Sequence, residues 1–345
     1  MSGLLEIAQP GIGTTVQDRG RAGHRHHGMP LSGWLDGPLA RAANALLGNP
    51  PDEAVLELRG TGTVLRVKAG PVRVALAGRI AATCLRSDSS RGPLPAWQSV
   101  TLREGDQLQL GPAESGCAYL AVAGGLLMEP QLGSRASYWR AGLAGVLGRA
   151  FRPGDALPCG AWSHADPREW RCRSPWTANE GPVRVLLGPQ QDHFTADAIA
   201  QFLGQDWEAT AAQDRMGLRF QGEPLAHVNA AAADIVSDGV TPGAIQVPAN
   251  GLPIVLLADG QTVGGYPKIA TVISADLPRL AHLKPGIRVR FEAVSHEAAH
   301  RALLDEHDRW QRWLASREIY LPPGTVDEAA LYASNLIDGM QRADP

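Results

Sequence analysis

The sequence predicts a mainly β protein, built from barrels or sandwiches with few helices. Glycine and proline contribute 39 and 26 of the 345 residues, and they divide the apolar stretches into short pieces. Alternation of apolar and polar residues with a period of two is the dominant hydrophobic pattern. The composition, 44% hydrophobic and 19% charged, is typical of a globular chain that is long enough for two domains.

Alternating segments define the expected strands. Residues 71–78 place Val72, Val74 and Leu76 on one face, which predicts a strand with one buried side. Residues 99–111 predict a hairpin, because two alternating runs flank a glycine turn. Further strands are expected near 63–68, 118–123, 183–187, 217–221, 244–247, 253–258, 268–274 and 287–293.

Four segments carry helical spacing instead. The first is expected over 34–47 with Ser32 as its N-cap, and the second over about 195–203. A third begins after Ser295, and a last one is expected over about 326–340. Helices are therefore a minor component of the predicted fold.

The chain is expected to form two β lobes. Residues 159–182 lack periodicity and mix proline, tryptophan and charge, which is typical of a connection between domains. We therefore expect an N-terminal β-barrel lobe over 1–178, a C-terminal β-barrel lobe over 179–300 and a helical appendage over 301–345.

Charge and hydropathy argue against several classes of protein. The net charge is −3 and no block of lysine or arginine occurs, which argues against a nucleic-acid partner. The longest nearly apolar run, 117–128, is too short to span a bilayer, and the N-terminus shows no secretory signal. A cytoplasmic protein with reduced thiols is expected, since no Cys-x-x-Cys pair occurs among Cys84, Cys117, Cys159 and Cys172.

Short motifs raise the possibility of a metal site. His-Glu-x-x-His at 296–300 is the pattern of zinc proteases, but the glycine and third histidine of the larger motif are missing. Three histidines at 24–27 have no carboxylate or cysteine near them in sequence. We predict no tightly bound metal and keep a zinc hydrolase as an alternative. Nucleotide-binding glycine loops and the Gly-x-Ser-x-Gly elbow are absent from the sequence.

An acid and a guanidinium stand side by side just before the strand expected at 217–221. Asp214 and Arg215 can orient a small amide or carboxylate through forked hydrogen bonds. A salt bridge within a turn is the structural alternative. The pair is therefore a candidate for the functional site.

A polar cluster interrupts the apolar strands in residues 261–268. Gly264 and Gly265 permit a positive φ or a close approach of the main chain to a ligand. An ordinary tight turn is again the alternative. The candidate side chains of this cluster are Gln261, Thr262, Tyr266 and Lys268.

Long ordered blocks carry a resemblance to a known family. They are residues 10–57, residues 118–157, "DRMGLRFQG" at 214–222 and "GAIQVPANGLPIVLLADGQTVGGYPKIATV" at 243–272. With these blocks the chain resembles the family of allophanate hydrolase subunit 2-like, or biotin-dependent carboxyltransferase-like, proteins. Its prokaryotic members include the C subunit of an ATP-dependent 5-oxoprolinase.

The resemblance implies both a fold and a function. The fold would be two cyclophilin-like β-barrel lobes. The chain would act with a partner like the B subunit of 5-oxoprolinase, sharing Mg-dependent ATP, to activate 5-oxo-L-proline, which the A subunit hydrolyses to L-glutamate. Two further roles stay open: a carboxyltransferase acting on urea or another amide with carboxybiotin, and a non-catalytic regulator that binds a kinase-inhibitor partner.

The resemblance also implies roles for the candidate residues. Asp214 falls where urea carboxylase has an amide-recognising asparagine, so Asp214, Arg215 and Lys268 are the expected catalytic set. The expected substrate-binding wall consists of Gln246, Gln261, Thr262, Gly264, Gly265 and Tyr266. The chain departs from the family pattern at Ala136, Ser137, Tyr138, Gln213, Gly260 and His282, among other positions.

Overall fold

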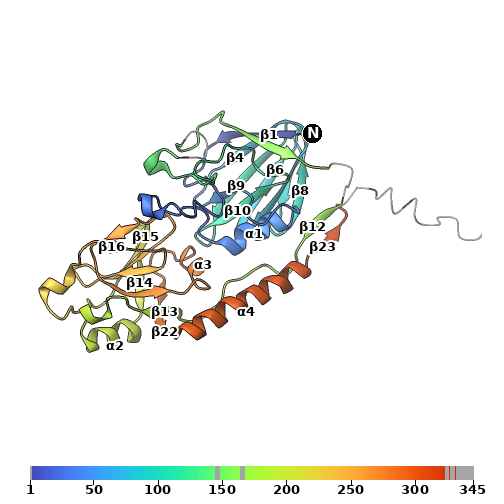
Figure 1. Cartoon of the computed structure of the whole chain (residues 1–345). Coiled ribbons are helices and arrows are strands. Elements are labelled where there is room, and N and C mark those ends of the chain that lie inside the picture. Colours follow the sequence, from blue (N-terminus) through green and yellow to red (C-terminus); the bar gives the residue numbers. More distant parts are fainter. Residues whose placement is uncertain (1, 144–147, 164–167, 323–325, 327–330, 332–345) are drawn as a thin grey trace, which may run out of the picture.

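Two β lobes and a long helix that runs alongside both make up the protein (Figure 1). The computed structural model describes residues 2–143, 148–163, 168–322, 326 and 331. Strands predominate over helices, which confirms the mainly β prediction. Among the described residues, no helix has the length and apolar character needed to cross a bilayer.

The N-terminal lobe consists of two sheets with a continuous apolar core of buried leucine, isoleucine and valine side chains. The six-stranded sheet comprises, in spatial order, β11 (Ala156–Ala161), β1 (Ser2–Gln9), β4 (Val64–Ala69), β9 (Gln107–Ala113), β6 (Ile80–Leu85) and β7 (Arg91–Leu94). The five-stranded sheet comprises β2 (Thr15–Gln17), β3 (Val55–Leu58), β10 (Ala118–Val122), β5 (Val72–Ala77) and β8 (Ser99–Leu102).

The C-terminal lobe is one eight-stranded sheet that nearly closes into a barrel, since its two edge strands β21 and β22 are consecutive in the chain. The order is β21 (Arg288–Val289), β14 (Trp207–Gln213), β15 (Gly217–Gln221), β18 (Ile254–Leu256), β17 (Ala244–Gln246), β20 (Lys268–Val272), β13 (Val183–Leu187) and β22 (Phe291–Ala293). A two-stranded ribbon joins β16 (Asp238–Gly239) to β19 (Val263–Gly264).

Two strand predictions are wrong in detail. Residues 99–111 do not form a hairpin, because β8 and β9 belong to different sheets. The buried Asp106 carboxylate accepts hydrogen bonds from the backbone N–H groups of Arg103 and Ser87, at 2.8 and 2.9 Å, and so directs the chain from one sheet to the other. Residues 287–293 form the two short strands β21 and β22, which pair with different neighbours.

Four α-helices accompany the sheets in the described part of the chain. They are α1 (Gly37–Ala45), α2 (Ala196–Gly204), α3 (Leu277–Leu280) and α4 (His296–Ala315), together with the 3-10 turns η1 (Arg25–His27), η2 (Trp139–Ala141), η3 (Gln191–His193) and η4 (Ala230–Ala233). Helix α1 is capped by Asp36, whose carboxylate accepts from the Leu39 N–H at 2.9 Å, so the expected Ser32 cap is wrong. Ser32 lies outside the helix with a φ of 54°.

Helix α4 connects the two lobes. It begins after Ser295, as predicted, and Ser295 caps it by accepting from the Ala298 N–H. The chain then returns to the N-terminal lobe, where β23 (Glu318–Tyr320) pairs with β12 (Glu169–Arg171). The helix expected over 326–340 falls outside the described residues, apart from two isolated positions.

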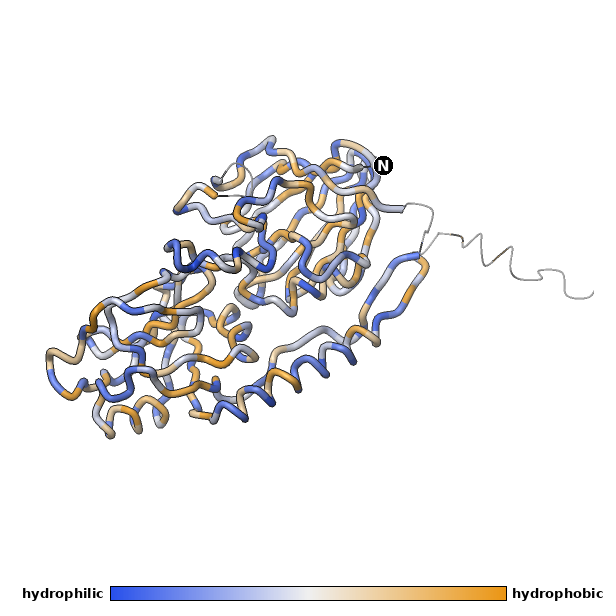
Figure 2. The backbone as a smooth tube through the Cα atoms, viewed as in Figure 1, coloured by the Kyte–Doolittle hydropathy of each residue, from blue (hydrophilic) through white to orange (hydrophobic). Residues whose placement is uncertain are grey.

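A second apolar core crosses from one lobe to the other. It includes Leu39 and Tyr119 of the N-terminal lobe together with Phe202 and Trp207 of the C-terminal lobe, and Trp313 of α4. Hydrophilic and hydrophobic residues alternate along α4, as expected for a helix with one packed side (Figure 2). The shared core fixes the lobes and α4 relative to one another.

Candidate functional site

Two adjoining cavities meet at Asp214. They have volumes of about 450 and 500 Å³, and both are lined by Arg140, Gln213, Asp214 and Met216. We call them together the Asp214 groove. Its first part is also lined by Ile12, Thr15, Arg59, Ser137, Tyr138, Trp139, Arg215 and Asp259. Its second part is also lined by Arg219, Gln246, Ile254, Gln261 and Tyr266.

Asp214 lies at the turn between β14 and β15. Its Oδ1 accepts hydrogen bonds from the Met216 N–H at 2.7 Å and the Gly217 N–H at 3.3 Å. Its Oδ2 faces the exposed Arg140 guanidinium at 3.8 Å. The side chain is 59% exposed. One carboxylate oxygen therefore shapes the turn, while the other is available to a ligand in the groove.

Arg215 points into the junction between the lobes. Its guanidinium contacts the Glu57 carboxylate at 2.5 Å and the Asp259 carboxylate at 2.9 Å, and it donates to the Gly33 carbonyl oxygen. Burial alone lowers the pKa of Arg215, but the charges of Glu57 and Asp259 outweigh burial and raise it. We call Arg215, Glu57, Asp259 and Gly33 the inter-lobe clamp.

The clamp continues into a buried polar network. Tyr119 donates its hydroxyl proton to Glu57 at 2.7 Å and accepts from the backbone N–H of Asp36 at 2.9 Å. The Asp36 carboxylate, in turn, is 2.8 Å from Nε2 of His282, which belongs to the C-terminal lobe. A second polar connection thus joins the two lobes.

His282 is held in its charged form. Burial lowers the pKa of the imidazole, but the neighbouring Cys117 and Asp36 outweigh burial and raise the pKa to about 11. Because burial raises the pKa of the Cys117 thiol, that thiol is neutral at pH 7. The Asp36 carboxylate is therefore the charge that keeps His282 protonated.

The glycines of the polar cluster allow a close approach of main chain to side chain. Neither Gly264 nor Gly265 has a positive φ. A Cβ on Gly264 would lie 2.4 Å from Nε2 of Gln246, whereas a Cβ on Gly265 would meet its nearest neighbour at 3.5 Å. Gln246 is 1% exposed, and its Oε1 accepts from Gln261 at 3.2 Å. Its Nε2 has no partner among the described residues.

Of the remaining candidate residues, Tyr266 lines the groove, whereas Thr262 and Lys268 make contacts within the protein. Tyr266, 41% exposed, lines the groove beside Gln261. The Thr262 carbonyl oxygen accepts from the Val240 N–H at 3.0 Å, and this contact holds the loop. Lys268 is buried, and its Nζ pairs with Asp238 at 2.7 Å. The structure therefore brings Asp214, Gln246, Gln261 and Tyr266 together, and it turns the Lys268 ammonium toward the ribbon.

The histidine motifs form no multidentate cluster in the described part of the chain, where no group of three His, Cys, Asp or Glu side chains could hold a metal ion. His296 is the first residue of α4 and His300 follows one turn later. The rings of His26 and His27 lie 3.7 Å apart beside a short 3-10 turn.

Several residues of the site could not be inferred from local patterns. Nothing in the sequence distinguishes Glu57, Asp259 and Asp36 from other acidic residues. Only the fold brings Glu57 and Asp259 to Arg215. It likewise brings Asp36 to His282. The surroundings of these three acidic residues give the only local signal, since each follows or precedes apolar residues that are buried. A carboxylate that is buried among apolar neighbours must have a cation or a hydrogen-bond donor beside it, but the local sequence does not show which residue that is.

Comparison with known proteins identifies the family. Residues 27–293 match the carboxyltransferase domain, subdomain A and B. The chain belongs to this family. It is 34% identical to the C subunit of 5-oxoprolinase from Escherichia coli (strain K12) over 305 residues, which are 88% of this chain and 95% of that protein. It is also 29% identical to the urea amidolyase of Lachancea kluyveri over 88% of this chain and 18% of that protein.

Solved structures of the family have the same fold. The crystal structure of the K. lactis urea amidolyase superposes with a TM-score of 0.79 at 24% identity, covering 90% of this chain and 20% of that one. The crystal structure of TTHA0988 superposes with a TM-score of 0.73 at 31% identity, covering 84% of this chain and 56% of that one. This chain thus spans about a fifth and about half, respectively, of those two proteins.

Proposed function

We propose that this chain is the C subunit of an ATP-dependent 5-oxoprolinase. With a partner of the B-subunit type it activates 5-oxo-L-proline, and the A subunit then hydrolyses the activated lactam to L-glutamate. The observation that carries this proposal is the match along 95% of the length of a protein named as the 5-oxoprolinase C subunit. The Asp214 groove supports it, since its second part offers the Asp214 carboxylate and the primary amides of Gln213, Gln246 and Gln261 to a compact polar substrate.

The chemistry needs help at both the nitrogen and the oxygen of the lactam. Asp214 Oδ2 accepts a hydrogen bond from the lactam N–H and thereby increases electron density on the carbonyl oxygen. That oxygen attacks the γ-phosphorus of ATP, the bond to the β-phosphate oxygen breaks, and ADP leaves. The lactam N–H proton passes to Asp214, which leaves a neutral O-phosphorylated imidate. Its ring carbon is then electrophilic enough for water to attack.

Gln246 supplies a second contact in this scheme. Its Nε2 is buried and has no partner among the described residues. A buried amide N–H without a partner costs about 1–3 kcal/mol, and a substrate carboxylate that accepts from it removes this penalty. The amide carbonyl of Gln246 is held by Gln261, so the N–H₂ group is fixed in orientation.

Most contacts to ATP are assigned to the B-type partner in this proposal. The clamp occupies the guanidinium of Arg215, so the cations of the groove that remain for a triphosphate are Arg59, Arg140 and Arg219. Three single positive charges fall short of the charge that a triphosphate carries. The nucleotide therefore enters the groove from the partner, with its magnesium.

A carboxyltransferase acting on urea or a related amide is the second candidate. The family description and the urea amidolyase relatives favour it. Ser137, Tyr138 and Gln213 line the groove at positions where this chain departs from the family pattern. These side chains are the ones most directly able to distinguish a five-membered lactam from urea.

Reconstitution separates the two candidates. The purified chain is mixed with the A and B subunits of 5-oxoprolinase, and glutamate release from 5-oxo-L-proline is followed with and without ATP. The proposal predicts release that requires all three proteins and ATP. A matched assay with urea and with carboxybiotin, which a biotin carboxylase makes from biotin, bicarbonate and ATP, is expected to show no carboxylation of urea. Carboxylation without glutamate release would instead establish the carboxyltransferase.

A further inference from the structure

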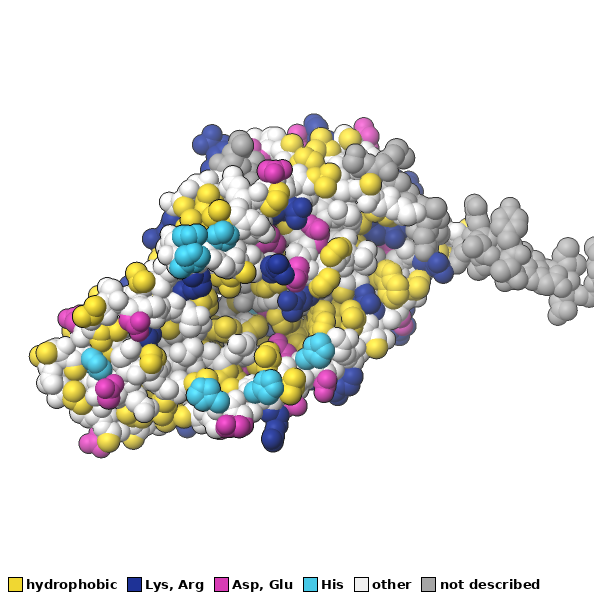
Figure 3. Space-filling model, viewed as in Figure 1, with side chains coloured by type: hydrophobic (Ala, Val, Ile, Leu, Met, Phe, Trp, Pro, Cys, Tyr) yellow, Lys and Arg dark blue, Asp and Glu magenta, His cyan; other side chains and the backbone are white. Residues whose placement is uncertain are grey.

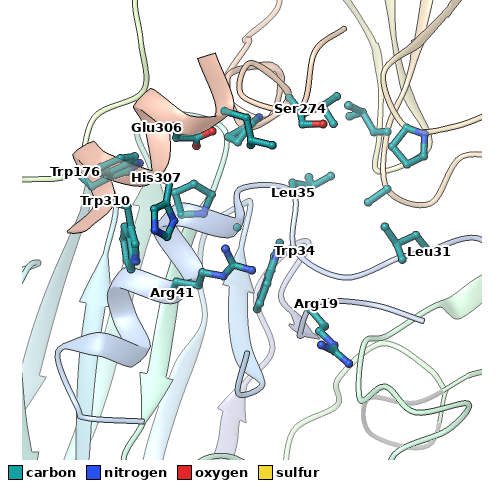
Figure 4. Close-up of a pocket in the computed structure, with 18 of the residues that line it drawn as sticks. Arg19, Leu31, Trp34, Leu35, Arg41, Trp176, Ser274, Glu306, His307 and Trp310 are labelled. Carbon is teal, nitrogen blue, oxygen red and sulfur yellow. The ribbon is translucent and has the colours of Figure 1, made fainter. Parts of the chain in front are cut away.

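A separate cavity of about 540 Å³ lies between the two lobes and α4. A hollow is visible at this place in the space-filling view, with hydrophobic, basic and acidic side chains around it (Figure 3). The N-terminal lobe contributes Trp34 and Arg41 to it, the C-terminal lobe contributes Ser274, and α4 contributes Glu306 and Trp310 (Figure 4). We call this space the α4 cavity.

The α4 cavity shares no lining residue with the Asp214 groove. Ser32 and Ala258, which line it, are joined across the lobes by a backbone hydrogen bond of 2.9 Å. The next residue after each, Gly33 and Asp259, holds Arg215 in the inter-lobe clamp. The clamp therefore separates the two spaces. The wall from α4 begins after residue 293, where the family match ends.

The lining of the α4 cavity is suited to an apolar ligand. Trp34, Trp176 and Trp310 are joined there by leucine and proline side chains from both lobes. Trp310 is itself stacked on Trp313 at 5.0 Å between ring centroids, so its position is fixed. A volume of this size, largely apolar and with a few polar groups, at a junction between domains is typical of a small-molecule site.

Opposite charges face this space from different elements. Glu306 of α4 is half-buried and has no hydrogen bond or ion pair among the described residues. Burial and the charge of Asp36 raise the pKa of Glu306 to about 7. Arg41 of α1 lies 5.5 Å from the Trp34 ring centroid and pairs weakly with Asp52 at 3.4 Å. One acid without a partner thus faces the same apolar space as the guanidinium groups of Arg41 and Arg19, which are both loosely paired with Asp52.

We propose that the α4 cavity binds a small apolar zwitterion, of the class of apolar amino acids and dipeptides, with its ammonium at Glu306 and its carboxylate at Arg41. An ammonium gives Glu306 the partner that the protein does not supply. A carboxylate can displace the Asp52 contact and pair with the Arg41 fork. The tryptophans and leucines then enclose the side chain of the ligand.

Matched ligands test each charge separately. Phenylalanine and leucyl-phenylalanine are titrated into the full-length chain by calorimetry, beside the C-terminal amide and the N-acetyl derivative of each. At least one zwitterion is expected to bind at millimolar concentration or tighter. Each derivative lacks one charge and is expected to bind about tenfold more weakly, the loss of one charged hydrogen bond.

Matched variants locate the site. Glu306→Gln should weaken the zwitterion about tenfold and leave the N-acetyl derivative unchanged, whereas Arg41→Gln should spare the amide derivative. Leu304→Trp, at an exposed position of α4 that lines the cavity, should abolish binding. Asp308→Asn, on α4 but outside the lining, is the control. No binding of either zwitterion, or equal binding in Glu306→Gln, would overturn the proposal.

Discussion

Asp214 and Arg215 are neighbours in the chain and have opposite surroundings. The Asp214 side chain is 59% exposed in the groove, while that of Arg215 is 12% exposed and bonded to both lobes. The difference arises because the turn between β14 and β15 points these two consecutive side chains in opposite directions. Two neighbouring residues can therefore have different roles: Asp214 is exposed to a ligand, and Arg215 holds the lobes together. Variants of Asp214 should lower activity, whereas variants of Arg215 should lower stability.

The largest expected effect is on the clamp. Arg215→Met leaves the Glu57 and Asp259 carboxylates buried without a cation to balance their charge, which should lower the free energy of unfolding by about 3–5 kcal/mol. Urea unfolding followed by tryptophan fluorescence measures this loss. Glu57→Gln added to Arg215→Met removes one of the stranded charges and should restore part of the stability. An Arg215→Met chain as stable as the wild type would contradict the clamp.

The next effect is on the groove. Asp214→Asn keeps an oxygen for the Met216 N–H and so preserves the turn, but it removes the charge. Glutamate release should fall about 10–100-fold, the value of a charged hydrogen bond, while the free energy of unfolding changes by less than about 0.5 kcal/mol. Asp308→Asn serves as the control for a lost surface carboxylate. A stability loss like that of Arg215→Met would erase the contrast between the two residues.

Much of the difference between Asp214 and Arg215 could not be predicted from the sequence. Alternation predicted β13 and β15 because each has one buried face, whereas β5 is buried at every position except Arg73. Asp214 was singled out because it stands beside Arg215 just before β15. The partners of Arg215 could not be predicted, since Glu57 is 158 residues away and only packing of the lobes joins them. The expected 99–111 hairpin failed for a similar reason: Asp106 makes tertiary contacts that no local pattern reveals.

A smaller effect is expected at the paired glycines. Gly264→Ala places a methyl group 2.4 Å from the Gln246 amide nitrogen, so the amide must leave its present position. The KM for the lactam should rise severalfold, with a loss of about 1–3 kcal/mol of stability from overpacking. Gly265→Ala is the matched control, because its Cβ makes only ordinary contacts of 3.5 Å or more. Equal KM values for both variants would show that Gln246 does not contact the substrate.

The smallest effect is a pH dependence in the second polar connection between the lobes. Because the pKa of His282 is raised in the folded chain, its contribution is complete below pH 6.5 and is lost as the pH rises toward about 11. Stability should therefore decline as the pH rises over this range, because the unfolded chain has already released the proton that the folded chain still holds. His282→Gln should be less stable than the wild type at low pH and should lose this slope. Parallel profiles for the two proteins would exclude His282 as the source.

The central claim is that the Asp214 carboxylate accepts the N–H proton of a cyclic amide. It is tested by comparing 5-oxo-L-proline with its N-methyl derivative, which has no N–H to donate, in binding to the reconstituted complex. The wild type should prefer the parent lactam by about tenfold or more, and Asp214→Ala should bind the two compounds equally. A preference that survives unchanged in Asp214→Ala would contradict the account.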